Sequence, residues 1–355
     1  MTRTLRVVVV DHSALTRSLI RDLVSRELDM TVVGDAAGGD AAISLVRKLA
    51  PDIVVLGANV RGPGSAEVAQ RLMIDVPCPI LVTASHNGDE QAAAIEALRF
   101  GALRITDLPT AGDPHFAGII RTMAAVRVVR ARGVVPATTA TPAVPAIATP
   151  MVVQPRTSGE PLIVAIGAST GGPPVLQQLL GALPAGFSNP ILVTQHISPG
   201  FTAAFAGWLD RVTPLQVQIA RDGERLSGGT VLIAPDGHHL GLARGDRVVL
   251  SADPPRSGHR PSVDWMMESV AAAAGSRVVA VQLTGMGMDG AVGCRAVADA
   301  GGSVLVQLLS TTVVASMPES VLASCPRARQ LAVNDLAAEL IRLEQGAKGR
   351  TDQRT

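Results

Sequence analysis

The chain contains no tyrosine, and its other aromatic residues are few, with two tryptophans and five phenylalanines among 355 residues. Any mechanism that needs a tyrosine as an acid or base is therefore excluded. Cysteine is also scarce, and Cys78, Cys294 and Cys325 lie far apart in the sequence. This spacing excludes a disulfide framework and gives no metal-ligand motif.

An excess of charge of one sign is missing too, because 31 Lys and Arg stand against 30 Asp and Glu. This balance gives no reason to expect nucleic acid or an anionic membrane surface as a partner. No apolar run could span a bilayer without charges or prolines, and no signal-peptide segment follows Met1. We therefore expect a soluble cytoplasmic protein that does not insert into membranes.

Strand and helix patterns alternate along most of the chain. The stretch "LRVVVVDHSALTRSLIRDLVSR" predicts a buried strand at Val7–Val10 and then a helix with Ser13 as its N-cap. Further strands are expected in "CPILVTAS" and "ALRITDLP", and later in "LIVAIG", "PILVTQH", "TVLIAP", "RVVAVQLTG" and "SVLVQL". This alternation predicts an α/β protein with two doubly wound parallel sheets.

A segment rich in Pro, Ala and Thr separates the two halves, "VVPATTATPAVPAIATPMVVQPRTSG". It carries few charges and shows no period, which is typical of a semi-extended linker. We expect a first domain at residues 1–125, ending in a helix within 118–133, a linker at 126–159 and a second domain at 160–346. Residues 347–355 are expected to form a disordered tail.

The most informative short motif is Gly167-Ala168-Ser169-Thr170-Gly171, which follows a predicted strand and precedes a predicted helix. This G-x-S-x-G pattern is typical of a nucleophilic serine on a sharp turn, with helix N–H groups available to an oxyanion. A phosphate-binding loop and a purely structural turn fit the same letters. A short-chain dehydrogenase, which "GAST" also resembles, would need the tyrosine that the chain lacks.

A nucleophilic serine needs a base, and His196 stands at the end of the strand "PILVTQH", where α/β sheets place functional groups. The adjacent His238 and His239 raise the possibility of a metal, but no third ligand has clear spacing, so we expect neither metal nor cofactor. His259 lies in a predicted loop. The remaining histidines, His12, His86 and His115, belong to the first half.

The base in turn needs an orienting acid, and Asp289 lies in the glycine-rich turn of "LTGMGMDGAVG" after another strand. An equally good interpretation from spacing alone is that Asp289 caps a helix. The order Ser, His, Asp differs from the Ser, Asp, His order of α/β-hydrolases, which indicates another fold lineage.

Five motifs in sequence order carry a family resemblance: "IGASTGGP", "QHISPGFTAAFAGWLD", "IAPDGHHL", "HRPSVDWMMESV" and "LTGMGMDGAVG". Together they resemble the chemotaxis protein-glutamate methylesterases of the CheB type over roughly residues 162–325. The first half, with "VVVVDHSALTR", "VVGDAAGGDAAI" and "PDIVVLG", resembles the receiver domain of the same family. The resemblance implies a flavodoxin-like receiver followed by a Rossmann-like methylesterase domain.

The resemblance also implies an activity, the hydrolysis of glutamate methyl esters and the deamidation of glutamines on cytoplasmic helices of chemoreceptors. It implies Ser169 as nucleophile, His196 as general base and acid, and Asp289 as the residue that orients the imidazole. Thr170, Gly171 and Met286 are expected to line the site and its oxyanion pocket. A chemotaxis histidine kinase or another signalling protein is an expected partner of the receiver-like domain.

The receiver half departs from the family at its phosphorylation site. The position of the phosphorylated aspartate is Gly57, and the acidic pair for Mg²⁺ is reduced to Asp11 followed by His12. Leu108 replaces the lysine before the late proline, and only Thr83 keeps the expected type. We expect a pseudo-receiver that is folded but not phosphorylated.

The esterase half also departs from the family pattern, because "VQLLSTTVVASMPES" keeps Gln307 and Met317-Pro318 but lacks the usual acids and glycine. These observations leave three hypotheses. The first is a receptor esterase and amidase that is not controlled by aspartyl phosphorylation. The second is a catalytically inactive relative that binds receptors or another signalling partner, and the third is an esterase or amidase with a different substrate.

Overall fold

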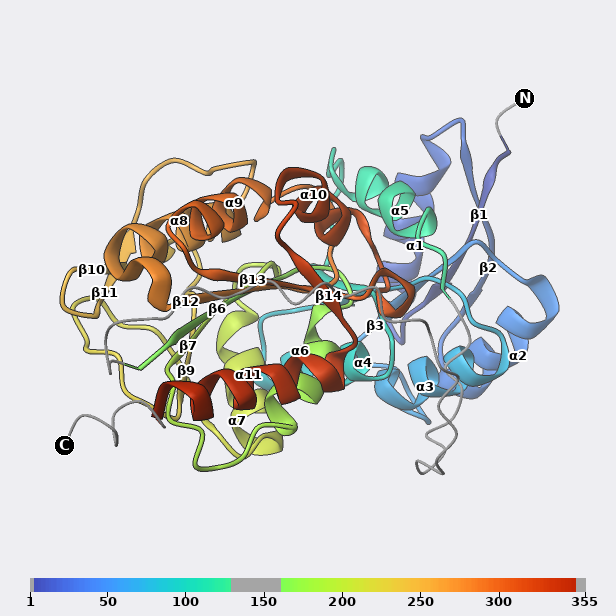
Figure 1. Cartoon of the computed structure of the whole chain (residues 1–355). Helices are drawn as coiled ribbons and strands as arrows, with labels where there is room; N and C mark the ends of the chain where they lie inside the picture. The colour runs from blue at the N-terminus through green and yellow to red at the C-terminus, as the bar shows by residue number, and fades with distance from the viewer. Residues whose placement is uncertain (1–2, 129–160, 349–355) are drawn as a thin grey trace.

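The computed structural model describes residues 3–128 and 161–348, which form two parallel-sheet α/β domains (Figure 1). Most of the predicted linker lies outside the described residues. Within the described ranges, no helix combines the length and the hydrophobicity needed to cross a membrane. In the same parts of the chain, no group of three or more His, Cys, Asp or Glu side chains could hold a metal ion.

The N-terminal domain is a five-stranded parallel sheet with the strand order β2-β1-β3-β4-β5, which is the flavodoxin-like order. Helices α1 and α5 cover one face, and α2, α3 and α4 cover the other (Figure 1). Its elements are β1 (Leu5–Val10), α1 (Ala14–Ser25), β2 (Met30–Ala36), α2 (Gly39–Leu49), β3 (Ile53–Gly57), α3 (Ser65–Asp75), β4 (Ile80–Ala84), α4 (Gly88–Arg99), β5 (Arg104–Asp107) and α5 (Phe116–Ala124).

The burial pattern of β1 explains why helices cover both faces of this sheet. The valines of β1 are fully buried and alternate between the two cores, with Val7 and Val9 facing α1 and α5. The predicted N-cap is confirmed, because the Ser13 side chain accepts a hydrogen bond from the Thr16 N–H.

The last helix of this domain is shorter than the sequence predicted, since α5 ends at Ala124. The residues that follow still belong to the domain, because Val126 is buried in its core and Val128 packs against it. Apolar packing therefore extends the domain to the beginning of the predicted linker.

The C-terminal domain is a seven-stranded parallel sheet with the order β14-β13-β12-β6-β7-β9-β8. Helices α8, α9 and α10 cover one face, and α6, α7 and α11 cover the other (Figure 1). Its elements are β6 (Ile163–Ala168), α6 (Gly172–Gly181), β7 (Ile191–Gln195), α7 (Thr202–Val212), β8 (Gln216–Ile219), β9 (Thr230–Ile233), β10 (His239–Ala243), β11 (Arg247–Ser251), α8 (Val263–Ala274), β12 (Val278–Gln282), α9 (Ala291–Asp299), β13 (Ser303–Gln307), α10 (Ser316–Ser324), β14 (Arg329–Leu331) and α11 (Val333–Lys348).

Two features of this domain differ from the sequence prediction. Strands β10 and β11 form a separate antiparallel hairpin, in which His239 pairs with Ser251. The final helix α11 runs to Lys348, so two residues assigned to the tail are helical.

The two domains pack against each other along α4 and α7 (Figure 1). Gln91 Nε2 donates to the Gly200 carbonyl at 2.8 Å, and the buried Ser198 Oγ donates to the Ile105 carbonyl at 2.6 Å. His86 lies over Phe201, with ring centroids 5.4 Å apart. Because Ser198 is two residues from His196, the N-terminal domain contacts the loop that carries a candidate site residue.

Candidate active site

Ser169 lies directly after β6, on a turn that passes into α6. Its N–H donates to the Thr284 carbonyl at 3.0 Å, and its carbonyl accepts from the Gly172 N–H at 2.8 Å. Gly171 allows this turn, since its φ of +76° is in the left-handed region and a Cβ there would lie 2.6 Å from Val313. The turn therefore brings the serine to the carboxyl edge of the sheet, close to the segment that follows β12.

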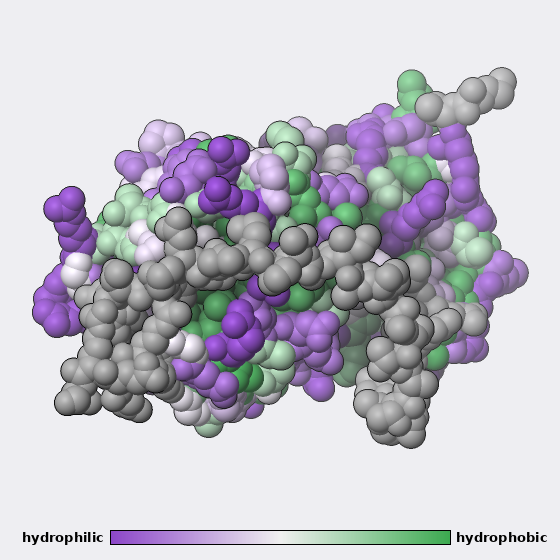
Figure 2. All heavy atoms as spheres, in the orientation of Figure 1, coloured by the Kyte–Doolittle hydropathy of each residue, from purple (hydrophilic) through white to green (hydrophobic). Residues whose placement is uncertain are grey.

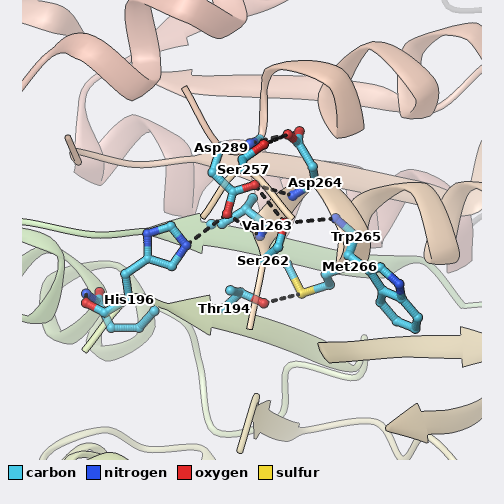
Figure 3. A network of polar contacts seen from close by, with 12 residues as sticks. Thr194, His196, Ser257, Ser262, Val263, Asp264, Trp265, Met266 and Asp289 are labelled. Carbon is cyan, nitrogen blue, oxygen red and sulfur yellow. Dashed lines mark hydrogen bonds and ion pairs between the residues drawn. The ribbon is translucent and has the colours of Figure 1, made fainter. Parts of the chain in front are cut away.

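His196 lies at the end of the neighbouring strand β7, and its N–H donates to the Ala168 carbonyl at 2.9 Å. The imidazole Nε2 lies 2.9 Å from Asp289 Oδ2, as Figure 3 shows. Its Nδ1 is buried and has no hydrogen-bond partner among the described residues. Since the carboxylate can only accept, Nε2 carries a proton, and in the neutral form of the ring Nδ1 keeps a free lone pair.

The hydroxyl of Ser169 makes no hydrogen bond within the described ranges. The structure thus brings the serine and the histidine to adjacent strand ends without a formed bond between their side chains. Catalytic hydrogen bonds are often long in the absence of substrate, so this geometry is compatible with a nucleophile and its base.

Asp289 is almost completely buried and accepts four hydrogen bonds (Figure 3). Besides His196, its donors are the Ser262 hydroxyl and the N–H groups of Val263 and Asp264, each at 2.8 Å. Burial alone would raise the pKa of this carboxyl, but the hydrogen bond and charge of His196 and the two backbone N–H groups outweigh burial. The pKa of Asp289 is therefore lowered, and the carboxylate is held ionised.

The N-cap interpretation of Asp289 is also partly right, although the helix is not the one that follows in sequence. Asp289 binds the first N–H groups of α8, whereas Asp264, from the first turn of α8, binds the first turn of α9. Asp264 Oδ1 accepts from the Gly290 N–H at 2.9 Å and from the Gly293 N–H at 2.8 Å. The two helices are thus capped reciprocally, and this fixes the carboxylate beneath His196.

His259 contacts the site although its sequence position gave no sign of it. Its ring stacks on that of His196, with centroids 3.9 Å apart and an angle of 11° between the planes. A tight turn presents the ring, with backbone hydrogen bonds in both directions between Arg256 and His259. Burial, followed by the charge of His196, lowers the pKa of His259 to about 4, so the stacked ring is neutral at pH 7.

The adjacent residues His238 and His239 make different contacts. His239 is fully buried at the start of β10 and accepts from the Ser262 N–H at 3.1 Å, while its Nε2 lies 3.2 Å from the Pro254 carbonyl. This places His239 behind Ser262, which itself binds Asp289. His238 is exposed, and its Nδ1 lies 3.2 Å from the Asp236 carbonyl.

The residues expected to line an oxyanion pocket come from two segments near Ser169: Thr170 follows it in the sequence, and Met286 follows Gly285, where a Cβ would lie 2.8 Å from Ser169 Cβ. Thr170 is buried, and Met286 is half-buried against apolar residues of the N-terminal domain. The backbone N–H groups of Thr170 and Met286 find no acceptor in the parts of the chain that the structure describes. An oxyanion beside a nucleophilic serine would require free donors of this kind.

Gln307, in the stretch that departs from the family pattern, is fully buried and supports this wall of the site. Its Oε1 accepts from the Thr284 N–H at 2.8 Å, and its Nε2 donates to the Thr311 carbonyl at 2.9 Å. The Thr284 hydroxyl in turn binds the Thr170 carbonyl at 3.1 Å. The altered stretch thus contributes hydrogen bonds that hold the segment beside Ser169.

The residues singled out in the receiver half lie at the ends of β1, β3, β4 and β5. Asp11 is buried, and its pKa is raised mainly by burial, against a hydrogen bond from the Ser13 N–H. His12 Nδ1 lies 3.6 Å from Asp11 Oδ1.

A Cβ on Gly57 would lie only 2.2 Å from Asp11 Oδ2, so the Asp11 carboxyl fills the space of a side chain at that position. The buried Thr83 hydroxyl has no partner among the described residues, and Leu108 is exposed.

The fold and the site together define the class of protein. A receiver-like domain precedes an α/β domain whose strand ends gather a serine, a histidine and a buried carboxylate, which is the side-chain set of serine hydrolases. Comparison with known proteins identifies the family. A model of the CheB methylesterase family matches residues 164–340. The chain belongs to the CheB methylesterase family, as its five motifs had indicated.

The relatives cover nearly the whole chain. Protein-glutamate methylesterase/protein-glutamine glutaminase 4 of Myxococcus xanthus is 38% identical over 97% of this chain and 98% of that protein. Protein-glutamate methylesterase/protein-glutamine glutaminase 2 of Anaeromyxobacter dehalogenans is 40% identical over 89% of this chain and 90% of that protein. The crystal structure of the Thermotoga maritima CheB methylesterase catalytic domain is 39% identical, with a TM-score of 0.50. The match covers 52% of this chain and 99% of the crystallised chain.

Proposed function

We propose that this chain is a protein-glutamate methylesterase and protein-glutamine glutaminase that uses Ser169, His196 and Asp289. The observation that carries the proposal is the state of the His196 ring. One ring nitrogen is bonded to a buried carboxylate, and the other is buried, free and at the strand end next to Ser169. This arrangement prepares the imidazole to accept a proton from the serine.

The reaction follows from these groups. Ser169 Oγ attacks the ester carbonyl carbon while its proton passes to His196 Nδ1, and the oxyanion is bound by the N–H groups of Thr170 and Met286. The tetrahedral intermediate then collapses, the C–O bond to methoxide breaks, and His196 gives its proton so that methanol leaves. Water attacks the glutamyl acyl-enzyme with His196 as base, releasing glutamate and free Ser169. With a glutamine substrate, ammonia leaves in place of methanol.

The proposed substrates are glutamyl methyl esters and glutamines on the cytoplasmic helices of chemoreceptors, and the proposed location is the cytoplasm. The names of the relatives support the ester and amide chemistry. A chemotaxis histidine kinase or another signalling protein is a proposed partner of the N-terminal domain.

We further propose that aspartyl phosphorylation does not control the enzyme. Gly57 cannot carry a phosphoryl group, and the nearby Asp11 carboxyl occupies the space beside it. His12 in place of a second acid leaves one carboxylate fewer for a hard cation.

The test is methanol release from membranes that contain methylated chemoreceptors, with the wild-type chain and the Ser169→Ala variant. We expect release by the wild type and none by the variant, because the substitution removes only the hydroxyl. Release that persists in the variant would contradict the proposal. A wild type that hydrolyses a short glutamyl methyl ester but not the receptor would favour another substrate, and inactivity on both would favour a binding protein.

A further inference from the structure

Buried polar side chains lie at the carboxyl ends of three strands in the C-terminal domain. Figure 2 shows hydrophilic residues over much of the visible surface, where polar side chains ordinarily lie. Gln195, Gln282 and Gln307 are instead 5% exposed or less, and they are the last residues of β7, β12 and β13. Because burying an amide costs free energy unless it is hydrogen-bonded, the bonding partners show what each glutamine does.

The partners of Gln195 are the proposed nucleophile and its proposed base. Gln195 Nε2 donates to the Ser169 carbonyl at 2.9 Å and to the His196 carbonyl, also at 2.9 Å. An amide NH₂ group has two hydrogens, so these two acceptors use both of them. One nitrogen therefore holds the backbone carbonyls of two residues that must react together.

The surroundings of Gln195 allow its amide only one orientation. If the amide nitrogen and oxygen were exchanged, the oxygen would face two carbonyl oxygens, so the contacts assign the donor to this side. Oε1 has no hydrogen-bond partner among the described residues, and a Cβ on Gly172 would lie 2.1 Å from it. The Gly172 N–H donates to the Ser169 carbonyl at 2.8 Å. The first residue of α6 thus leaves room for the amide and shares its acceptor.

Gln282 makes similar bonds on the other side of β6. Its Nε2 donates to the Gly167 carbonyl at 3.1 Å and to the Leu283 carbonyl at 3.3 Å. A buried glutamine at a strand end therefore holds the ends of two neighbouring strands together. Gln195 does the same for β6 and β7, but its acceptors are members of the proposed triad.

We propose that Gln195 is a positioning residue, which sets the separation of Ser169 Oγ and His196 Nδ1 by holding the two backbone carbonyls on one amide nitrogen. The inference rests on the proposed function, because it assumes that Ser169 and His196 react together. Among the described residues, the Gln195 amide is the only group that bonds to both of them.

The physical reason is that the backbone of each residue is held on both sides of its Cα. The Ser169 N–H binds the Thr284 carbonyl and the His196 N–H binds the Ala168 carbonyl, while Gln195 holds the two carbonyls that follow. Without the amide, two carbonyl oxygens would face each other with no donor between them, so the residues would move apart. A displacement of about 1 Å between reacting groups can lower a rate about 100-fold.

The first test variant is Gln195→Met, which keeps the length of the side chain but carries no N–H. The matched control is Asn189→Leu, because Asn189 is a buried amide beside the amino ends of β6 and β7. Asn189 Oδ1 accepts from the Leu162 N–H at 2.9 Å, so this bond also joins the two strands but lies at the opposite edge of the sheet. For each protein, kcat and KM are measured on methylated receptor membranes and on a short glutamyl methyl ester, and urea unfolding is measured in parallel.

We expect Gln195→Met to lower kcat about 100-fold on both substrates while KM stays close to the wild-type value, because the amide contacts the reacting residues and not the substrate. Both variants should unfold at lower urea concentration, since each loses buried hydrogen bonds. Asn189→Leu should keep the wild-type kcat. A folded Gln195→Met variant with nearly full kcat would overturn the inference, as would an equal loss of kcat in Asn189→Leu.

A second variant, Gly172→Ala, tests the same contact if Gln195→Met does not fold. The added Cβ would lie 2.1 Å from Gln195 Oε1, so the amide must shift although it is still present. We expect a lower kcat with KM close to that of the wild type, and an unchanged kcat would overturn the inference. Wild-type activity on the short ester alone would contradict the proposed receptor substrate but still test Gln195. Inactivity of the wild type on both substrates would overturn the proposed function, and the role of Gln195 with it.

Discussion

His196 is the residue on which the other groups of the site converge. Asp289 binds one ring nitrogen, His259 stacks on the ring face, and the remaining nitrogen is free among the described residues. The ring can therefore keep its orientation while a proton is added and removed, which is what a general base requires.

Replacement of Asp289 by Asn should lower kcat by about 10⁴-fold, because the amide cannot stabilise the imidazolium or hold the Nε2–H tautomer. The measurement is steady-state hydrolysis of the methylated receptor, with thermal unfolding as a check that the variant is folded. A folded variant with nearly full kcat would show that Asp289 serves only as a helix cap.

His259 should make the stability of the protein depend on pH in a defined window. Its pKa is about 4 in the folded protein and near 6.5 when unfolded, so the unfolded state binds more protons between these values. The free energy of unfolding is then unaffected by this residue above pH 6.5 and falls as the pH drops toward 4.

The corresponding measurement is urea unfolding at pH 7 and pH 5 for the wild type and His259→Gln. We expect the wild type to lose on the order of 1 kcal/mol more than the variant between these two pH values. An equal loss in both proteins would mean that His259 is not buried in its neutral form.

At this scale the sequence predicted Ser169, His196 and Asp289 as site residues, because each follows a strand and carries a recognisable motif, and the structure brings His196 and Asp289 into hydrogen-bond contact. It could not identify the stacking of His259, which depends on how a loop folds back over the end of β7. It also left open whether Asp289 caps a helix or binds a histidine, and in the structure its carboxylate makes both sets of contacts.

At the scale of elements, the reciprocal capping of α8 and α9 links the position of Asp289 to the packing of these two helices. Asp264 binds two backbone N–H groups of the first turn of α9, and burial raises its pKa against the opposing Gly293 N–H. The carboxylate of Asp289 adds to this rise, so the two acids are held in a small space by the N–H groups of two helices.

Replacement of Asp264 by Ala should lower the free energy of unfolding by about 1–3 kcal/mol, because the Gly290 and Gly293 N–H groups lose their buried acceptor. Asp299→Ala serves as the control, since its carboxylate is exposed and pairs with Arg295 on its own helix. Urea denaturation gives both values, and equal midpoints for the two variants would show that the capping contributes nothing.

The parallel sheets were predictable from continuous apolar runs such as Val7–Val10, since buried parallel strands read in this way. The hairpin of β10 and β11 was not, because His239 interrupts its apolar pattern while being fully buried there. Its burial depends on the hydrogen bonds of both ring nitrogens, which only the folded structure brings together.

At the scale of the whole molecule, the N-terminal domain contacts the loop that carries His196. Ser198 joins β5 to the segment after His196, and Met286 packs against the core of the first domain. The sequence predicts that Gly57 stands at the position of the phosphorylated aspartate, and in the structure the Asp11 carboxyl lies in the space of a side chain there.

Restoring an aspartate by Gly57→Asp should therefore not create a phosphorylated receiver. The new Cβ would lie 2.2 Å from Asp11 Oδ2, so the buried Asp11 must move and two carboxyl groups must share the space. Mass spectrometry after incubation with acetyl phosphate and Mg²⁺ measures this directly, and a peptide of the variant phosphorylated at the substituted position would contradict the expectation.

The central claim is that this chain is a serine esterase that works without phosphorylation. The most direct measurement is the rate of methanol release from methylated chemoreceptor membranes by the full chain, with and without acetyl phosphate and Mg²⁺. We predict release at the same rate under both conditions. Release only in the presence of the phosphodonor would contradict the account.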